Sequence, residues 1–444
     1  MSFLSLLEES SGQRKKRPHA AGRITAVRGS LLFGHLPSAK LGDICIVQRE
    51  CSPLPVQVVS FERDLLCFAP LGVPEGIACG AKVERSSSQT TLELPDKTGG
   101  LVVNALGEPI SDCHLKRDLE ISLSTKHHNV LSRPPICERF ITGIKSIDLF
   151  TPLGKGQRMG LFASAGLGKS TLLGMLARHC SADVIVLALI GERGREVREF
   201  IEDCLGPEGF KRTIIVVSTS DEPALKKAMA AKTACSIAEH YREQGKDVLL
   251  LFDSLTRFAR AIRDVGLASG EMPVRQGLTP SVYSELPLLL ERAGTSKQGS
   301  ITAIYTVLTE EEHQADSLAG EIRSLLDGHI ELDRTLFEQG YRPSIDISRS
   351  LSRLENKFAH DEMQLPIGYI RKMFGRLKRD RDLILLGGSP DQDLKHYLDK
   401  EPTLKKLLNQ PPETGYQYQD TVDQLNKACL EIAKRSASSG AITT

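Results

Sequence analysis

A glycine-rich segment between an apolar run and a predicted helix carries the residue types and spacing of a nucleotide-binding loop. It reads GLFASAGLGKST over residues 160–171. The general pattern is GxxxxGK followed by Ser or Thr, and Ala163 stands here at the first glycine. In such loops backbone N–H groups surround the β-phosphate, Lys169 contacts the β and γ oxygens, and the Ser170 hydroxyl binds Mg²⁺. The candidate nucleotide-binding residues of this phosphate loop are Ala163, Ser164, Ala165, Gly166, Leu167, Gly168, Lys169, Ser170 and Thr171.

Charged side chains also follow two other apolar runs of strand-like composition. DVIVLALIGERGRE leads to Glu192 and Arg193, and DVLLLFDSLTRFARA leads to Asp253. Ligands of open parallel sheets bind beyond the carboxyl ends of the strands, so we expect these side chains beside the phosphate loop. Asp253 is predicted to hold Mg²⁺ through water, and Glu192 to polarise a water in line with the γ-phosphate. A helix N-cap or an ion pair with a neighbouring arginine is the alternative role of each carboxylate.

Bulk composition is that of a globular protein with more than one domain. The chain has 444 residues, and its 57 Lys and Arg balance 56 Asp and Glu, so no net field concentrates nucleic acid or an acidic membrane. The ten cysteines never approach CxxC spacing, which argues against zinc and disulfide frameworks. No run of 18 apolar residues and no signal-peptide pattern occurs, and we therefore expect a cytoplasmic protein.

Changes in hydrophobic pattern divide the chain into five segments. Residues 21–93 contain short apolar alternations separated by Gly and Pro, which predict a small β-barrel or sandwich. Residues 94–144 are rich in turn residues and are interpreted as a linker and the approach to the core. Strand and helix patterns alternate over 145–355, which predicts an α/β domain with a parallel sheet. Residues 356–444 have a polar helical pattern.

The N-terminal segment, residues 1–20, has two interpretations. Phe3, Leu6 and Leu7 have helical spacing and precede a basic run from Arg14 to Arg17. This pattern is typical of a short amphipathic helix that docks on a partner or on a membrane surface. The alternative is a mostly disordered tail.

Beyond these individual motifs, the segments PLGKGQRMGLFASAGLGKST, IGERGREVREF, LLLFDSLTRFARA, PSVYSELPLLLERAG, SITAIYTVL and EIRSLLDGHIELDR together resemble one family. They are similar to the export ATPases of flagella and type III secretion, which are relatives of the catalytic subunit of rotary ATP synthases. The resemblance runs from about residue 21 to 400, and alanine is frequent at the first loop glycine of this family. It implies a RecA-like core between an N-terminal β-barrel and a C-terminal helical domain, with ATP and Mg²⁺ as cofactors.

The same resemblance implies a ring of six subunits in which an arginine of one subunit enters the site of the next. IDISRSLSRLENK matches the segment that carries this arginine, and the corresponding residue is Arg353. Together with Lys169, Glu192 and Arg193, it completes the predicted catalytic set. The family usually has Tyr directly before Pro, with its ring on the adenine. Here EQGYRPSIDI places Arg342 in that position and Tyr341 one residue earlier, and both are candidate base-binding residues.

Three functions are compatible with these motifs. The leading hypothesis, taken from the resemblance, is a homohexameric ATPase that energises protein export, releases chaperones and unfolds export substrates. Its expected partners are stalk and regulator proteins, and its expected location is the cytoplasmic face of the inner membrane, with peripheral membrane contact. The alternatives are an RNA-dependent ring ATPase like the transcription termination factor and a non-catalytic ring subunit. The first conflicts with the few aromatic residues of 21–93, and the second conflicts with the retention of Glu192.

Overall fold

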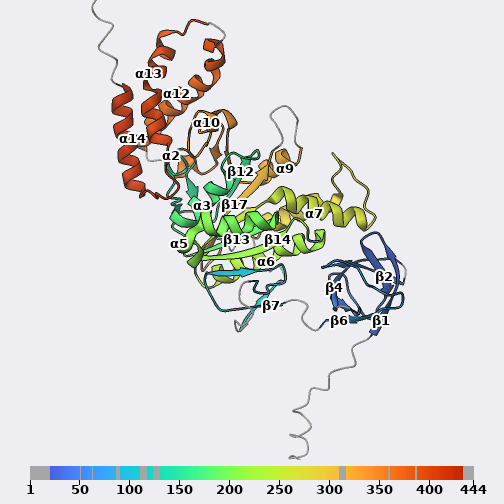
Figure 1. The fold of residues 1–444 in the computed structure, drawn as a ribbon. Coiled ribbons are helices and arrows are strands. Elements are labelled where there is room, and N and C mark those ends of the chain that lie inside the picture. Colours follow the sequence, from blue (N-terminus) through green and yellow to red (C-terminus); the bar gives the residue numbers. More distant parts are fainter. Residues whose placement is uncertain are drawn as a thin grey trace, which may run out of the picture.

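A computed structural model describes residues 21–50, 52–62, 64–86, 91–110, 118–123, 131, 133–309, 317–358, 361–385 and 388–433. The predicted helix or tail at 1–20 lies outside this range. A β-barrel, a sheet with helices on both faces and a group of C-terminal helices follow one another along the chain. The barrel and the C-terminal helices lie at opposite ends of the molecule, with the core between them (Figure 1). The predicted fold class is thereby confirmed.

The N-terminal barrel closes through the strand order β1-β2-β5-β4-β3-β6. Its strands alternate buried and exposed residues, as the sequence pattern predicts, and Leu32, Val56 and Phe68 are completely buried in its interior. The strands are β1 (Ala21–Arg28), β2 (Leu31–His35), β3 (Ile44–Val47), β4 (Leu54–Glu62), β5 (Leu65–Pro70) and β6 (Lys82–Arg85). A separate antiparallel pair, β7 (Thr91–Leu94) and β9 (Leu119–Ser122), follows the barrel.

The core is a mainly parallel sheet of order β19-β18-β12-β17-β15-β13-β14-β8, in which β19 runs antiparallel to β18. All nine residues of β13 are buried, which explains its continuous apolar sequence. The strand β8 comes from the segment predicted as a linker and pairs with β14. The strands are β8 (Leu101–Val103), β12 (Arg158–Ala163), β13 (Val184–Glu192), β14 (Thr213–Thr219), β15 (Asp247–Asp253), β16 (Gly294–Thr295), β17 (Ser300–Leu308), β18 (Gly328–Glu331) and β19 (Leu351–Ser352).

Alternate residues of the core strands enter two different hydrophobic clusters. Val186 and Ala188 pack with α6, α7 and α8, whereas Leu187 and Leu189 pack with α2 and α3. The sheet is therefore covered on both faces. The helices of this region are α2 (Lys145–Phe150), α3 (Lys169–His179), α4 (Gly194–Glu199), the π-helix η2 (Phe200–Leu205), α5 (Gly206–Lys211), α6 (Ala224–Glu243), α7 (Leu255–Ala268), α8 (Pro280–Leu290), α9 (Ser317–Leu325), α10 (Arg334–Glu338) and α11 (Glu355–Phe358), and the short strands β10 (Arg139–Phe140) and β11 (Leu153–Gly154) form a further pair.

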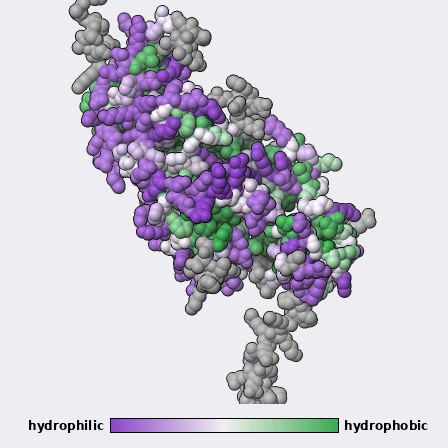
Figure 2. All heavy atoms as spheres, in the orientation of Figure 1, coloured by the Kyte–Doolittle hydropathy of each residue, from purple (hydrophilic) through white to green (hydrophobic). Residues whose placement is uncertain are grey.

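The C-terminal helices share the hydrophobic cluster of the α3 face. They are α12 (Asp361–Leu385), α13 (Gln392–Leu408) and α14 (Tyr418–Ala433), and buried residues of all three belong to the cluster that contains Leu172 of α3. Lys378 of α12 also pairs with Asp333 and Asp346 of the core. On the face shown in Figure 2, hydrophilic side chains cover most of these helices. Among the helices that the structure describes, none is long and apolar enough to cross a membrane.

Candidate active site

The phosphate loop joins the carboxyl end of β12 to the first turn of α3. Gly166 and Gly168 have φ angles of 80° and 84°, a left-handed conformation that glycine adopts without strain. A side chain at Gly166 would meet no atom within 4 Å, so the backbone of the loop borders open space. The loop and the N-terminal end of α3 line a cavity, and a helix N-terminus at a cavity is an arrangement that binds phosphate.

The strand order brings the predicted carboxylates to this loop. Asp253 ends β15, which is separated from β12 by β17, and Glu192 ends β13, the next strand beyond β15. The Nζ of Lys169 is 2.5 Å from Asp253 Oδ1 and 3.8 Å from Glu192 Oε1. Asp253 Oδ1 also accepts a hydrogen bond of 2.7 Å from Thr306 Oγ1. Lysine and both carboxylates thus meet at the carboxyl edge of the sheet, as their positions in the sequence predict.

Glu192 is buried and has the electrostatic environment of a general base. Burial and the nearby charge of Asp253 raise its pKa to about 7, while Lys169 and Arg257 act in the opposite direction. Arg257 Nη2 donates a 3.2 Å hydrogen bond to Glu192 Oε2. Glu192 Oε1 lies 3.2 Å from Arg257 Nε but has no hydrogen-bond partner among the described residues. The Arg257 guanidinium therefore lies against both oxygens of the Glu192 carboxylate.

A cavity of about 890 Å³ opens from the phosphate loop toward the C-terminal helices. Phe337 and Arg342 lie in its lining, and the Arg342 guanidinium carbon is 3.7 Å from the centre of the Phe337 ring. The Nη1 of Arg342 donates to the backbone oxygens of Phe337 and Tyr341 at 2.7 and 2.8 Å. Gln410 and Pro412, from the connection between α13 and α14, complete this end. The same cavity thus contains the phosphate loop and a stacked pair of an arginine and an aromatic ring.

Tyr341 is not in the lining of this cavity. It is 4% exposed, and its ring packs edge to face on Phe374 of α12 at 6.1 Å. The prediction of Tyr341 as a base-binding residue is therefore corrected: its side chain belongs to the contact between the core and the C-terminal helices. The position before Pro343 is the one that reaches the cavity, and it is occupied by Arg342.

The two remaining predicted arginines lie in different places. Arg193 lines the cavity, and its exposed side chain pairs with Glu196 at 3.6 Å. Arg353 follows β19, is exposed and is absent from the cavity lining. The backbone N–H of Arg353 donates to the carbonyl oxygen of Asp327, and the backbone N–H of Asp327 donates to the carbonyl oxygen of Arg158. Arg353 therefore lies near Arg158, which begins β12 at the end opposite the phosphate loop. With six residues in β12 and about 3.3 Å per residue, Arg353 lies on the order of 20 Å from the phosphate loop of its own chain.

The donors at the loop fit magnesium. Ser170 is exposed at the start of α3, and Asp253 supplies a carboxylate at the end of β15, so the available ligands are oxygens. Among the described residues no cluster of three or more His, Cys, Asp or Glu forms a closed metal site. Oxygen ligands such as these are the type that Mg²⁺ prefers, with water and substrate phosphates completing its shell.

Arg257, Phe337 and Gln410 are among the cavity residues that sequence reasoning missed. Arg257 had a local signal, because it lies one helical turn after the strand end at Asp253. Phe337 had none beyond its proximity to the Tyr341–Pro343 segment. Gln410 is 241 positions after Lys169 and enters the site through the tertiary packing of α13 and α14. Its side chain donates to Gly143 O at 2.8 Å.

The loop, its strand and its helix, with carboxylates from adjacent strand ends, define a P-loop nucleotide-binding protein. Residues 143–352 match the ATP synthase alpha/beta family, nucleotide-binding domain. The flagellum-specific ATP synthase of Treponema pallidum (strain Nichols) is 39% identical over 411 residues, covering 91% of this chain and 92% of that protein. The type 3 secretion system ATPase of Pseudomonas syringae pv. syringae is 42% identical over 417 residues, covering 91% and 92%.

Solved structures agree with these sequence matches. The assembled ATPase EscN of the enteropathogenic E. coli type III secretion system has a TM-score of 0.85 and 39% identity, covering 92% of this chain and 100% of EscN. EscN in complex with its central stalk EscO has a TM-score of 0.83 and 38% identity, covering 92% and 100%. The chain belongs to the family of flagellar and type III secretion ATPases, which confirms the resemblance found in its motifs.

Proposed function

We propose that the chain hydrolyses ATP with Mg²⁺ at the phosphate loop. Lys169 neutralises charge on the β and γ phosphates, and Ser170 and Asp253 hold the cation. Magnesium supplies charge neutralisation at the transferred phosphoryl group. Glu192 orients the attacking water and accepts its proton. The single observation that carries this proposal is the meeting of Lys169, Glu192 and Asp253 within 3.8 Å at one edge of the sheet.

We propose further that the active unit is a homohexameric ring in which Arg353 acts on the neighbouring subunit. The distance along β12 supports this, because Arg353 cannot reach the phosphate loop of its own chain. An arginine supplied in this way stabilises charge on the transferred phosphoryl and contributes about 10³ to 10⁵ in rate. Arg193 is proposed as a second cation at the water side of the site. The relative EscN is described as assembled, which agrees with a ring.

The cellular role follows from the family. We propose that ATP hydrolysis energises protein export through a flagellar or type III apparatus, with release of chaperones and unfolding of export substrates. A stalk protein is a proposed partner, supported by the complex of EscN with its central stalk EscO. Regulator proteins and a peripheral position at the cytoplasmic face of the inner membrane complete this proposal.

The aromatic residues of the barrel favour this role over an RNA motor. Phe68 is completely buried, and Phe33 lies beneath the Arg28 guanidinium, 5.2 Å from its carbon. Phe61 is the third aromatic side chain of this segment, and it is 63% exposed. A surface that stacks successive bases presents several exposed rings, and these three phenylalanines do not form one.

The proposal is tested by steady-state hydrolysis of Mg-ATP at increasing protein concentration. We expect activity per subunit to rise cooperatively with concentration, because each site is completed by a second chain. The Glu192→Gln variant, which keeps the size of the side chain, is expected to bind nucleotide and to lose turnover. Activity that does not change with concentration would contradict the role of Arg353 in trans. Inactivity of the wild-type protein at all concentrations would favour a non-catalytic ring subunit.

A further inference from the structure

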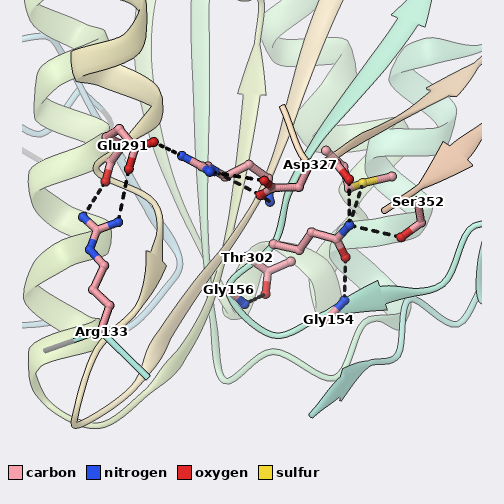
Figure 3. Close-up of polar contacts among 10 residues, drawn as sticks. Arg133, Gly154, Gly156, Glu291, Thr302, Asp327 and Ser352 are labelled. Carbon is pink, nitrogen blue, oxygen red and sulfur yellow. Dashed lines mark hydrogen bonds and ion pairs between the residues drawn. The ribbon is translucent and has the colours of Figure 1, made fainter. Parts of the chain in front are cut away.

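A second polar network lies at the amino end of β12, opposite the phosphate loop. It contains Gln157 and Arg158, the last two residues of the GKGQR sequence, to which the proposed chemistry assigns no role. Figure 3 shows the contacts that link this end of the strand to Asp327 and Ser352 on one side and to Glu291 on the other. The network therefore joins the phosphate-loop strand to the segment that carries Arg353.

Gln157 is completely buried and uses both ends of its amide. Its Oε1 accepts a 2.8 Å hydrogen bond from Gly154 N. Its Nε2 lies 3.1 Å from Ser352 Oγ and 3.2 Å from Asp327 O, donating to both. The same Asp327 oxygen accepts the backbone N–H of Arg353 at 3.0 Å. The side chain of Gln157 thus shares an acceptor with the backbone of Arg353 and binds the residue before it.

Asp327 is itself fixed by Arg158. The backbone N of Arg158 and its Nε both bind Asp327 Oδ2, at 3.1 and 3.0 Å, and its Nη2 binds Oδ1 at 3.2 Å. The remaining Nη1 of Arg158 donates to Glu291, whose backbone oxygen accepts from Arg133 Nη2 at 2.8 Å. Arg158 therefore holds the carboxylate of Asp327, while the Asp327 carbonyl accepts from the Gln157 side chain and from the Arg353 N–H.

The backbone of Arg353 is bound by this network, whereas its side chain is not. Its N–H is bound, and Ser352 donates from Oγ to Pro152 O at 2.7 Å. Its guanidinium is exposed and makes no hydrogen bond or ion pair with the described part of its own chain. Burial of the Gln157 amide costs free energy unless the amide is hydrogen-bonded, and an apolar side chain of the same size would avoid that cost. The polar connection therefore restricts the position of the segment.

We propose that Gln157 is a positioning residue for Arg353: it holds residues 352 and 353 so that the guanidinium is presented to the nucleotide site of the neighbouring subunit. This inference rests on the proposed role of Arg353 in trans. It adds a residue whose influence appears in the adjacent site, while the phosphate loop of its own subunit is unaffected. A displacement of about 1 Å in a catalytic group reduces turnover by about 10²-fold.

The test begins with Gln157→Met, which keeps the approximate length and volume of the side chain and removes its hydrogen bonds. We expect kcat to fall about 10²-fold, with KM and ring assembly unchanged. Ser352→Ala, a smaller change, is expected to lower kcat in the same direction. A loss of nucleotide affinity in the variant's own site, measured by titration of a fluorescent ADP analogue, would instead indicate general disruption of the core and would overturn the inference.

The decisive experiment mixes subunits. Lys169→Ala has an inactive site but an intact Arg353, whereas Gln157→Met has an intact site but a displaced Arg353. In random one-to-one rings with head-to-tail contacts, we expect activity per Gln157→Met subunit to recover to about half of the wild-type value. Arg353→Ala mixed with Lys169→Ala is the matched control. Recovery in the control without recovery for Gln157→Met would overturn the positioning role alone. Recovery in neither mixture would remove the assignment of Arg353 as well.

Discussion

The environment of Glu192 predicts an acidic limit to turnover near neutral pH. Its pKa is raised to about 7 by burial and by Asp253, and a general base acts in its ionised form. At one pH unit below the pKa about a tenth of the sites are ionised, and at one unit above about nine tenths are. We therefore expect kcat/KM for Mg-ATP to fall about tenfold from pH 8 to pH 6, because this ratio reports ionisations of the free enzyme.

The assay is steady-state hydrolysis at low Mg-ATP concentration between pH 5.5 and pH 9, at a protein concentration where rings are assembled. The terminal phosphate of the nucleotide titrates near pH 6, so a limb in this region has two potential sources. The Arg257→Gln variant separates them. Arg257 lowers the pKa of Glu192, and its removal moves an enzyme limb to higher pH while leaving a nucleotide limb in place.

Two results would refute the reasoning. A kcat/KM profile that is level from pH 8 to pH 6 would mean that the ionisation of Glu192 does not control the reaction. A limb that keeps the same midpoint in Arg257→Gln would belong to the nucleotide or to another group. Ring assembly measured at each pH is the control, because dissociation at low pH would also reduce activity.

Two further predictions concern the base pocket and the contact between domains. Arg342→Ala removes the cation stacked on Phe337 and is expected to raise KM for ATP about fivefold with kcat nearly unchanged, as measured by steady-state kinetics; a change in kcat alone would contradict a role in binding the base. Lys378→Ala leaves Asp333 and Asp346 buried without their cation and is expected to lower the free energy of unfolding by about 3 kcal/mol in denaturant titrations. Arg376→Ala is the matched control: Arg376 is partly exposed, pairs with the exposed Asp391 and the partly buried Asp380, and its loss should cost less than about 1 kcal/mol.

The parts of the site that follow strand ends were accessible from sequence. Lys169, Glu192 and Asp253 each follow an apolar run, and the carboxyl ends of parallel strands meet at one edge of a sheet. The shared edge was therefore predictable, whereas the strand order β12-β17-β15-β13, which sets how close the three side chains lie, comes from the structure. The architecture was accessible for a similar reason, because the change from short alternations to long apolar runs marks the change from barrel to parallel sheet.

Other parts depend on tertiary packing that local patterns do not encode. Tyr341 and Arg342 are adjacent, and their order in the sequence does not reveal which side chain enters the cavity. The structure places Tyr341 against Phe374 of α12, a residue of the C-terminal helices. Gln410 reaches the cavity from the same helical region. Residues of this kind require the arrangement of the C-terminal helices on the core.

Arginines illustrate how the structure adds to a motif. In the sequence, Arg257, Arg353 and Arg158 each lie beside a short motif, and nothing in the pattern shows which groups they bind. In the structure, Arg257 is bound to Glu192, and Arg158 is bound to Asp327, so each serves its own chain. The Arg353 guanidinium has no such partner among the described residues, although its backbone N–H is bound to Asp327 O. A group that acts on a neighbouring subunit requires a fixed backbone and a side-chain charge without a partner in its own chain. Arg353 has both among the described residues, and it lies at the far end of β12 from its own phosphate loop.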